Sequence, residues 1–592
     1  MESSLSLNSN ASSVTTVERS QPLYNNICMI YSRDEGSILT QRLFQECETE
    51  IMQAKNKVEY DGFYRKDLGT DYYIWEKKRD KIWHGIVTKM SIFEKIDLWF
   101  IDLILTSSKL AFERAPAPAP SSMFEGVSTT ITDLFAEELK HSVENEKWED
   151  IGKLRFHKSV EFFTSRWQPV EAVLPAFPCK SSNQEKVFGV MPDKGEELAL
   201  TRLIHFARKV KKIYPPGFII WVVSDGHVFS DCIAVDDSRV NAYFSALKQL
   251  YYRIIDGDDS VSDSVSDSVS DDCIRFCSLP EIFRLTKWFD CSMVDHIELG
   301  HFLDTEIDPE SELCRKILMS SCDTDNGKLY MEVKTPSHPR LSLFRGFSKF
   351  MTEDLQFHPK VCKMTRKMFK KITSKVAFEM IRRNDAYSNL VELMFPFHLR
   401  FSIHAHNNSG PKFGISLLRS QCRHITSIKD HKEIRYADLL HIPTPWHNSI
   451  VKIDDDETYF VIKAKKVEEE LNKGSGYGHW DQKNLHYRMP DQLKIKTDAL
   501  KRLVKEERLY KQEVRDHEQY VDRMKANEAD DYEIKKQIEV LEEGYRMIPK
   551  VRERILELKQ QLNDLLIEFG GQEEVGEVKK VLAEVDESKS KK

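Results

Sequence analysis

Residues 214–231, YPPGFIIWVVSDGHVFSD, decide the fold. The run Phe218–Val223 is wholly apolar, which is typical of a strand buried on both faces of a parallel sheet. Before it, Glu196–Tyr214 carries apolar residues at helical spacing and ends at two prolines and a glycine. The short apolar run Lys186–Met191 is interpreted as a preceding strand. Strand, helix and strand predict a βαβ unit, and therefore an α/β fold with a parallel sheet.

Later segments extend the predicted core. Asp236-Asp237-Ser238 is expected to cap a helix that runs to about Ile255. Phe397–Ala405 alternates apolar and polar residues, and Asn407–Gly410 is interpreted as a turn into a strand that returns at Lys412–Leu418. Two more strands are expected at residues 448–453 and 459–463.

Shifts in composition divide the chain into segments. The core is assigned to residues 170–470, interrupted at residues 256–272 by an acidic repeat that cannot bury apolar area. The interpretation of that repeat as a solvated loop competes with one as a phosphorylated or partner-binding patch. The other expected segments are a disordered N-terminus (1–20), a mainly helical region (21–169) with a Pro-rich loop (115–122), a linker (471–495), a helical extension (496–570) and a charged tail (571–592).

The helical extension has a coiled-coil pattern. Its apolar residues are spaced alternately three and four apart: Ile548, Val551, Ile555, Leu558, Leu562, Leu565 and Phe569. Pro549 interrupts the pattern that precedes this seam, which favours two helices or a kinked one over a single rod. Self-association through residues 534–569 is therefore a hypothesis.

Composition excludes several classes of protein. The chain has 592 residues and a net charge of −8, which argues against a general nucleic-acid binder. The apolar run Leu98–Leu105 is too short to cross a bilayer, and the first twenty residues lack the pattern of a secretory signal. Eleven cysteines at irregular spacing favour a reduced compartment. We expect a cytoplasmic protein that binds neither membrane nor nucleic acid.

The turn after Phe218–Val223 carries the first candidate site residues. In parallel α/β sheets, ligands bind outside the carboxyl ends of the strands, where Asp225 and His227 are expected. Asp225 is suited to orient a substrate amine, and His227 to transfer protons near neutral pH. The alternative is a tight turn in which Asp225 bonds to backbone amides.

The polar face of Phe397–Ala405 carries further candidates. Arg400, Ser402 and His404 share this face, and Lys412 is expected beside Arg400 in the neighbouring strand. Two cations in this position would form a site for a phosphate or carboxylate. The alternative is an outer face of an antiparallel hairpin in contact with water.

Imidazoles and one tryptophan complete the candidates. His404, His406 and His447 raise the possibility of a metal site, but no carboxylate lies at a recognisable ligand spacing, so acid–base histidines are favoured and no metal is predicted. Trp446 would stack on a substrate ring or belong to the core. The chain lacks GxGxxG, GxxxxGK[ST], GxSxG and HExxH, so nucleotide-dependent redox, P-loop and α/β-hydrolase chemistry are poorly supported.

Several separated segments resemble the pyoverdine/dityrosine biosynthesis family, which includes isocyanide synthases and proteins of spore-wall dityrosine maturation. The resemblance spans roughly residues 170–465. The segments are AFPCKSSNQEKVFGVMPDKGEELAL (176–200), YPPGFIIWVVSDGHVFSD (214–231), AVDD (234–237), SLFRGFSKFMTEDL (342–355), AFEMIRRNDAYSNLVELMFPFHLRFSIHAHNNSGPKFGISLL (377–418) and TPWHN (444–448).

This resemblance implies a Rossmann-like fold and an enzyme without a redox cofactor. It implies condensation of an amino acid, here tyrosine, with a ketose of the ribulose 5-phosphate type, which leaves one sugar carbon on nitrogen as an isocyanide or formyl group. Arg345 and Ser348 are expected phosphate contacts. A cytochrome P450 that couples tyrosine rings is an implied pathway partner. The alternatives are a secondary-metabolite synthase acting on another amino acid such as valine, and a non-catalytic coiled-coil scaffold.

Overall fold

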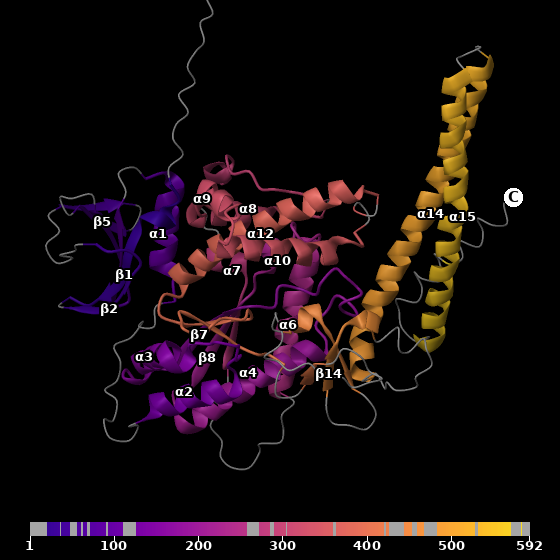
Figure 1. The fold of residues 1–592 in the computed structure, drawn as a ribbon. Coiled ribbons are helices and arrows are strands. Elements are labelled where there is room, and N and C mark those ends of the chain that lie inside the picture. The colour runs from indigo at the N-terminus through magenta and orange to yellow at the C-terminus, as the bar shows by residue number, and fades with distance from the viewer. Residues whose placement is uncertain are drawn as a thin grey trace, which may run out of the picture.

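A computed structural model describes most of the chain (Figure 1). The described residues are 21–35, 37–47, 56–60, 63–67, 72–89, 93–109, 126–256, 272–284, 289–303, 305–358, 361, 363–418, 422–424, 443–452, 459–466, 482–526, 531–569 and 582. The predictions for residues 1–20, for the Pro-rich loop, for the acidic repeat between its first and last residues and for nearly all of the charged tail lie outside them.

A five-stranded parallel sheet forms the centre of the molecule. Its strand order is β11-β10-β7-β8-β9, and each neighbouring pair runs parallel. The strands are β7 (Val170–Pro175), β8 (Phe218–Val223), β9 (Ile274–Cys277), β10 (Leu399–Ser402) and β11 (Lys412–Gly414). The predicted α/β fold is confirmed.

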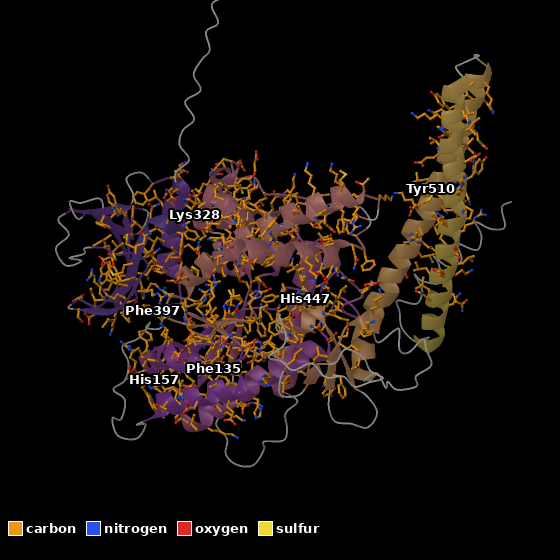
Figure 2. The ribbon with its side chains drawn as sticks, in the orientation of Figure 1. Phe135, His157, Lys328, Phe397, His447 and Tyr510 are labelled. Carbon is orange, nitrogen blue, oxygen red and sulfur yellow. The ribbon has the colours of Figure 1, made fainter. Side chains whose placement is uncertain are left out.

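Helices cover both faces of this sheet, as Figure 1 shows. One face packs on α2 (Val127–Glu138), η3 (Trp148–Gly152), α3 (Lys153–Thr164), α4 (Lys194–Ile213) and α6 (Asp237–Asp256). The other packs on α1 (Lys95–Ser107), α5 (Gly226–Phe229), α7 (Leu279–Phe283), η5 (Cys291–Val294), α8 (Pro309–Cys322), α10 (Pro339–Leu355) and α12 (Arg366–Met394), with α9 (Asn326–Glu332) beside them. Phe135, labelled in Figure 2, stacks on Phe156 at 4.1 Å and on Phe401 of the sheet at 5.3 Å between ring centroids.

The predicted βαβ unit is correct in its helix and second strand. α4 and β8 lie where the sequence placed them, and α6 follows as expected. The prediction of a strand at Lys186–Met191 is wrong, and β7 takes that place in the sheet. Gly189 has φ of +135°, which a regular strand does not adopt, and the Lys186 amine is committed to an ion pair with Asp354.

The prediction of a mainly helical region before the core is wrong for the described residues between 27 and 89. These residues form an antiparallel sheet in the order β2-β1-β6-β5-β4-β3, preceded by η1 (Leu23–Asn26). The strands are β1 (Ile27–Arg33), β2 (Ile38–Leu43), β3 (Asn56–Tyr60), β4 (Phe63–Asp67), β5 (Tyr72–Arg79) and β6 (Ile82–Lys89). Aromatic and β-branched residues favour strands, and Asp80, at φ of +53°, turns β5 back into β6. The helices α1, α2 and α3 fit the prediction.

The predicted hairpin at residues 397–418 is also wrong in direction. β10 and β11 pair in parallel, with Arg400 opposite Lys412 and Ser402 opposite Gly414. The segment between them therefore carries the chain back to the edge of the sheet where the parallel strands begin, and β11 starts there. The later strands form a small separate sheet of β12 (Cys422–His424), β14 (Tyr459–Ile462) and β13 (Ser449–Lys452), in that order.

Two long helices end the described chain. α14 (Gln482–Ala526) and α15 (Asp531–Phe569) lie side by side and project from the α/β body, as Figure 1 shows. α14 begins inside the predicted linker, and α15 continues through Pro549 as one helix. Val551, Ile555 and Leu562 of the heptad seam are buried in a cluster with Leu500 of α14. The seam is thus an intrachain contact, and self-association through it stays a prediction.

Candidate functional site

The parallel sheet brings the two main candidate segments to one edge. β7 lies between β8 and β10, and all three strands run in the same direction. Asp225 follows the end of β8 and His404 follows the end of β10. Because neighbouring strands lie about 4.8 Å apart, these strand ends are separated by about 10 Å. This is the edge at which ligands bind in open α/β sheets.

Asp225 is a half-buried acid, and no opposite charge among the described residues compensates its carboxylate. Its Oδ1 is buried and has no hydrogen-bond partner in the described protein, and its side chain does not cap α5. Burial raises the pKa of this carboxyl to about 7. A hydrogen bond from its own backbone N–H to the carboxyl opposes this rise, as the tight-turn alternative expects, so both interpretations of Asp225 stay open. A carboxyl with this pKa is suited to accept a proton near neutral pH.

His227 lies two residues after Asp225, in the short helix α5, and makes separate hydrogen bonds. Its Nε2 lies 2.9 Å from Oδ1 of Asn241, while its buried Nδ1 has no partner in the described protein. Burial lowers the pKa of the imidazole, so the ring is neutral at physiological pH. Its backbone carbonyl accepts a hydrogen bond from Arg315 at 3.0 Å, which fixes the turn from below.

Arg400 and Lys412 meet under α12. Arg400 Nη2 donates to Oγ of Ser388 at 3.4 Å, and Lys412 Nζ donates to the same oxygen at 3.0 Å. Arg400 Nε is buried and unpaired, and neither cation has a carboxylate within ion-pair distance among the described residues. Burial, and then the Arg400 charge, lowers the pKa of Lys412. Two adjacent cations without an acid partner form a site for an anion.

Ser402 connects the cation pair to the strand end. Its Oγ accepts a hydrogen bond from the His404 backbone N–H at 3.2 Å and lies 2.9 Å from His406 Nε2. Burial, and then the Lys412 charge, lowers the pKa of His406 to about 4. Ser402 therefore positions the histidine loop. The His404 side chain is exposed.

His447 lies in a cationic, buried environment. Its pKa is lowered well below the usual value by burial and by the charges of Lys186, Lys463, Lys180 and His404, in that order. Its Nδ1 is buried and unpaired in the described protein, and its ring packs edge-on against Phe350 at 5.0 Å. The electrostatic coupling places His404 and His447 in one neighbourhood.

Trp446 and the two candidates on α10 differ in their surroundings. Trp446 is 1% exposed and packs on Phe177, which matches the interpretation as a core residue. Ser348 has a buried hydroxyl without a partner in the described protein. Arg345 is exposed. Phosphate contact by Arg345 and Ser348 stays a prediction.

Sequence reasoning missed several residues of this region. They are Ser388 and Tyr387 on α12, and Lys180, Lys186, Lys463 and Asp354. The Tyr387 hydroxyl donates to the Val223 carbonyl, and its pKa responds to the charges of both Asp225 and Arg400. The Tyr387 hydroxyl is therefore within electrostatic reach of both Asp225 and Arg400. The adjacent hydroxyls at 387 and 388, about two turns before the end of α12, were the available signal.

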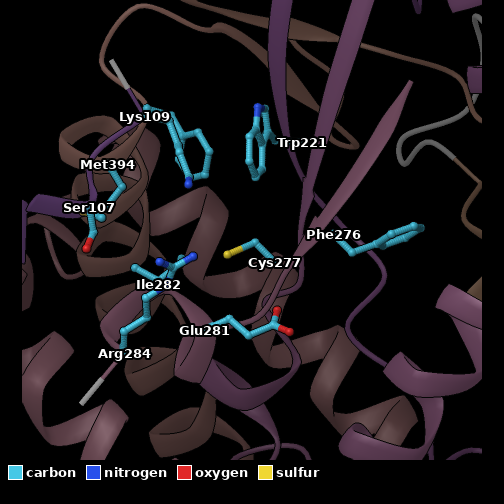
Figure 3. Close-up of a pocket in the computed structure, with 10 residues that line it drawn as sticks. Ser107, Lys109, Trp221, Phe276, Cys277, Glu281, Ile282, Arg284 and Met394 are labelled. Carbon is cyan, nitrogen blue, oxygen red and sulfur yellow. The ribbon is translucent and has the colours of Figure 1, made fainter. Parts of the chain in front are cut away.

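A separate cavity of about 310 Å³ lies on the α12 side of the sheet (Figure 3). It is lined by Ser107, Lys109, Trp221, Phe276, Cys277, Glu281, Ile282, Arg284, Met394 and Phe395. None of the ten predicted site residues lines it. Burial raises the pKa of the Cys277 thiol to about 12, so this sulfur is protonated at neutral pH.

The described residues contain no group of three or more His, Cys, Asp or Glu residues arranged to hold a metal ion. Among their helices, none combines the length and the apolar character that a bilayer crossing demands.

A sequence model of the pyoverdine/dityrosine biosynthesis protein family matches residues 160–474, more than half of the chain. The chain belongs to this family. It is 45% identical over 424 residues to the spore wall maturation protein DIT1 of Saccharomyces cerevisiae, covering 70% of this chain and 76% of that protein. The family also includes enzymes that make isonitriles (isocyanides) from amino acids.

Two of these enzymes are more distant relatives. The L-tryptophan isonitrile synthase AmbI2 of Fischerella ambigua is 26% identical over 52% of this chain and 76% of its own length. The L-tyrosine isonitrile synthase of Pseudomonas aeruginosa is 27% identical over 55% of this chain and 82% of its own length. A second model, of tubulin binding cofactor A, matches residues 488–583, which include most of α14 and all of α15.

Proposed function

We propose that this protein converts the amine of L-tyrosine into an isocyanide or N-formyl group, with a ketose of the ribulose 5-phosphate type as the one-carbon source, for the dityrosine of a spore wall. The spore wall maturation protein supports the biological role and the L-tyrosine isonitrile synthase supports the reaction class. The pairing of Arg400 with Lys412 under α12, without an acid partner in the described protein, carries the proposal, because such a pair suits a sugar phosphate.

The remaining residues suit the other demands of the reaction. Asp225 accepts a proton from the substrate ammonium, because only a neutral amine attacks a ketone. His227 and His447, which burial keeps neutral, are suited to transfer protons. His404, near His447, is a further acid–base candidate. These roles are part of the proposal.

The direct test is product analysis. The purified chain is incubated with ribulose 5-phosphate and tyrosine, tryptophan or valine in parallel, and products are identified by mass spectrometry without acid, since acid hydrolyses isocyanides to formamides. We expect a tyrosine product. A product from valine or tryptophan alone would favour the secondary-metabolite alternative. No product from any amino acid would favour the scaffold.

The anion site is tested by Arg400→Gln and Lys412→Met. Each should raise the KM for the sugar phosphate about tenfold or more, the order that one charge-assisted contact contributes, with a smaller effect on the KM for tyrosine. Lys367→Met, at an exposed position of α12, is the matched control. An unchanged KM in both site variants would remove this pair from phosphate binding.

A second function is proposed for the C-terminal helices: binding of tubulin by residues 488–583. The match to tubulin binding cofactor A supports it. So does the surface of the helix pair, where large apolar side chains are exposed: Leu509, Tyr520, Val540, Tyr545 and Leu556. Leu509 and Tyr520 lie on α14 and the other three on α15, and exposed apolar residues of this size are suited to a protein interface.

Co-elution of the full chain with purified tubulin on size exclusion tests this function. Leu509→Ser and Leu556→Ser should weaken binding, whereas Leu154→Ser, an equally exposed leucine on α3, should not. Isocyanide formation should be unaffected by all three. Failure of the unsubstituted chain to bind tubulin would contradict the proposal.

A further inference from the structure

Three lysines surround His447 at the edge of the central sheet. Lys180 follows β7, Lys186 lies in the segment before α4, and Lys463 directly follows β14. All three lower the pKa of the His447 imidazole, so their charges lie within electrostatic reach of this ring. Figure 2 places His447 within the α/β body, apart from the C-terminal helices.

Two of these lysines are neutralised by buried acids. Lys180 Nζ lies 3.0 Å from Asp193 and 2.8 Å from Glu196, and it also donates to the Pro445 carbonyl at 2.9 Å. Lys186 Nζ lies 2.5 Å from Asp354. Each amine is held in place by its ion pair, so it is not free to approach a substrate carbonyl.

Lys463 differs from both. Its Nζ donates to the His447 carbonyl at 2.6 Å, and among the described residues no carboxylate lies within ion-pair distance. The nearby Asp354 is already paired with Lys186 and also accepts from Ser181. Burial, and then the Lys186 charge, lowers the pKa of Lys463 to about 8. A desolvated lysine beside a second cation is the environment of amines that form Schiff bases.

We propose that Lys463 is a catalytic nucleophile that forms a Schiff base with the ketone of the sugar phosphate. The inference rests on the proposed function and adds a covalent step to it. The neutral amine adds to the carbonyl carbon, and one amine proton passes to the oxygen, which gives a carbinolamine. Loss of the second amine proton together with hydroxide, as water, gives the imine. The amino acid's amine then adds to this carbon and displaces Lys463, which leaves as a free amine.

The surroundings of Lys463 favour this sequence. His447 remains neutral at physiological pH, so its unpaired Nδ1 is suited to take the proton that carbinolamine formation releases and to return it when water leaves. The ring of Phe350 packs against both His447, at 5.0 Å, and the Lys186 amine, at 4.2 Å. This apolar cover limits water at a step that hydrolysis would reverse.

Reductive trapping tests the proposal on the unsubstituted, full-length chain. The protein is mixed with ribulose 5-phosphate and cyanoborohydride, digested, and mapped by mass spectrometry. We expect one sugar-derived adduct on the peptide that contains Lys463. The adduct should be suppressed when tyrosine and the sugar are added together before the reductant, because turnover then removes the imine. Ribitol 5-phosphate, which has no carbonyl, should leave the peptide unmodified.

Two variants make the test specific. Lys463→Arg keeps the charge and should abolish the adduct, lower kcat by about 100-fold or more, as loss of an acid–base or nucleophilic group does, and leave the Kd for the sugar phosphate unchanged. Lys466→Arg, three residues further on at an exposed position, should behave as the unsubstituted chain. Lys463→Ala should regain part of its rate when ethylamine is supplied in solution, which a merely structural role would not allow.

The outcomes separate this inference from the proposed function. A tyrosine product without any Lys463 adduct, and with kcat retained in Lys463→Arg, would overturn the inference and leave the function standing. An adduct on Lys463 without a product from any amino acid would support the nucleophile and count against the proposed reaction.

Discussion

At the scale of single residues, Asp225 is expected to affect both the stability of the fold and the proton transfer of the proposed reaction. Its carboxyl is placed after a buried strand, and burial raises its pKa from 3.8 to about 7. Between these values the folded protein holds a proton that the unfolded chain has lost, so this residue makes the protein less stable as pH rises through that window. An amide in its place avoids the charge.

Asp225→Asn should therefore stabilise the fold at pH 8 by about 1–3 kcal/mol while lowering kcat about 100-fold. The stabilisation should grow between pH 5 and pH 7 and level off above the raised pKa. Urea unfolding at several pH values measures it. A stability difference that does not change with pH would contradict the buried, uncompensated acid.

At this scale the sequence located a polar face but not all of its neighbours. Alternation along one strand placed Arg400, Ser402 and His404 on one face, because side-chain direction in a strand follows from spacing alone. Lys412 was expected beside Arg400 through a hairpin, and the two residues are neighbours although β10 and β11 pair in parallel. The sequence could not identify Lys463, because only the folded structure shows which lysines form ion pairs. Glu196 pairs with Lys180 and Asp354 pairs with Lys186, and neither acid forms an ion pair with Lys463.

The short helix α5 is held by two buried arginines. Arg315 donates to the His227 carbonyl and pairs with Asp237, and Arg383 donates to the Val228 carbonyl and pairs with Asp231 at 2.6 Å. These contacts fix the loop that carries Asp225. Removal of one partner would leave a buried charge uncompensated.

Arg383→Met should cost about 3–5 kcal/mol of unfolding free energy, because Asp231 and Glu379 lose their buried ion pairs with Arg383, and Arg315, at 3.8 Å from Asp231, compensates only part of the lost charge. The matched control is Lys248→Met, which breaks the exposed Lys248–Glu281 pair at 2.8 Å and should cost about 0–1 kcal/mol. Urea unfolding of both variants at pH 7 measures the two losses of unfolding free energy. Equal losses in the two variants would show that the Arg383 network does not hold α5.

The C-terminal helices support each other through the predicted seam. Leu562→Ala, at a fully buried position, should destabilise the helix pair by about 2–4 kcal/mol. Leu556→Ala, where the side chain is 49% exposed, should have an effect within about 0.5 kcal/mol. Thermal unfolding followed by circular dichroism measures both, and sedimentation shows whether either change alters self-association. A loss at Leu556 as large as at Leu562 would contradict the packing of α15 on α14.

Elements were predictable where one periodicity dominated. α4, β8 and the heptad seam follow directly from their spacing. The N-terminal sheet was not recognised, because aromatic residues fit both strands and packed helices, and only the pairing of β1 with β6 decides between them. The parallel pairing of β10 with β11 depends on a crossover that local turn residues do not specify.

The N-terminal sheet lies against the anion site of the core. Arg42 of β2 pairs with Glu392 of α12 at 3.1 Å, and the Tyr24 hydroxyl donates to the other carboxylate oxygen at 2.9 Å. The charge of Glu392 acts on Arg400, but the two do not form an ion pair. Arg42 and Tyr24 thus hold the Glu392 carboxylate in contacts of its own, which supports the proposal that Arg400 binds the anion of a substrate.

Arg42→Met should free Glu392 to approach Arg400 and compete with the sugar phosphate. We expect the KM for the sugar phosphate to rise about 3- to 10-fold, which corresponds to the energy of one half-exposed ion pair. Glu392→Gln in the same chain should restore the KM, since the competing charge is gone. Steady-state kinetics of the two single variants and the double variant measure this coupling. A KM that Glu392→Gln does not restore would mean that Arg42 acts by another route.

At the level of the whole molecule, the origin of the carbon atom added to the tyrosine nitrogen tests the proposed reaction most directly. Uniformly ¹³C-labelled ribulose 5-phosphate and unlabelled tyrosine are incubated with the full chain, and the product is analysed by mass spectrometry and carbon NMR without acid. We expect a tyrosine derivative with a single labelled carbon bonded to its nitrogen. An unlabelled product, or unchanged tyrosine under conditions in which the sugar phosphate binds, would contradict it.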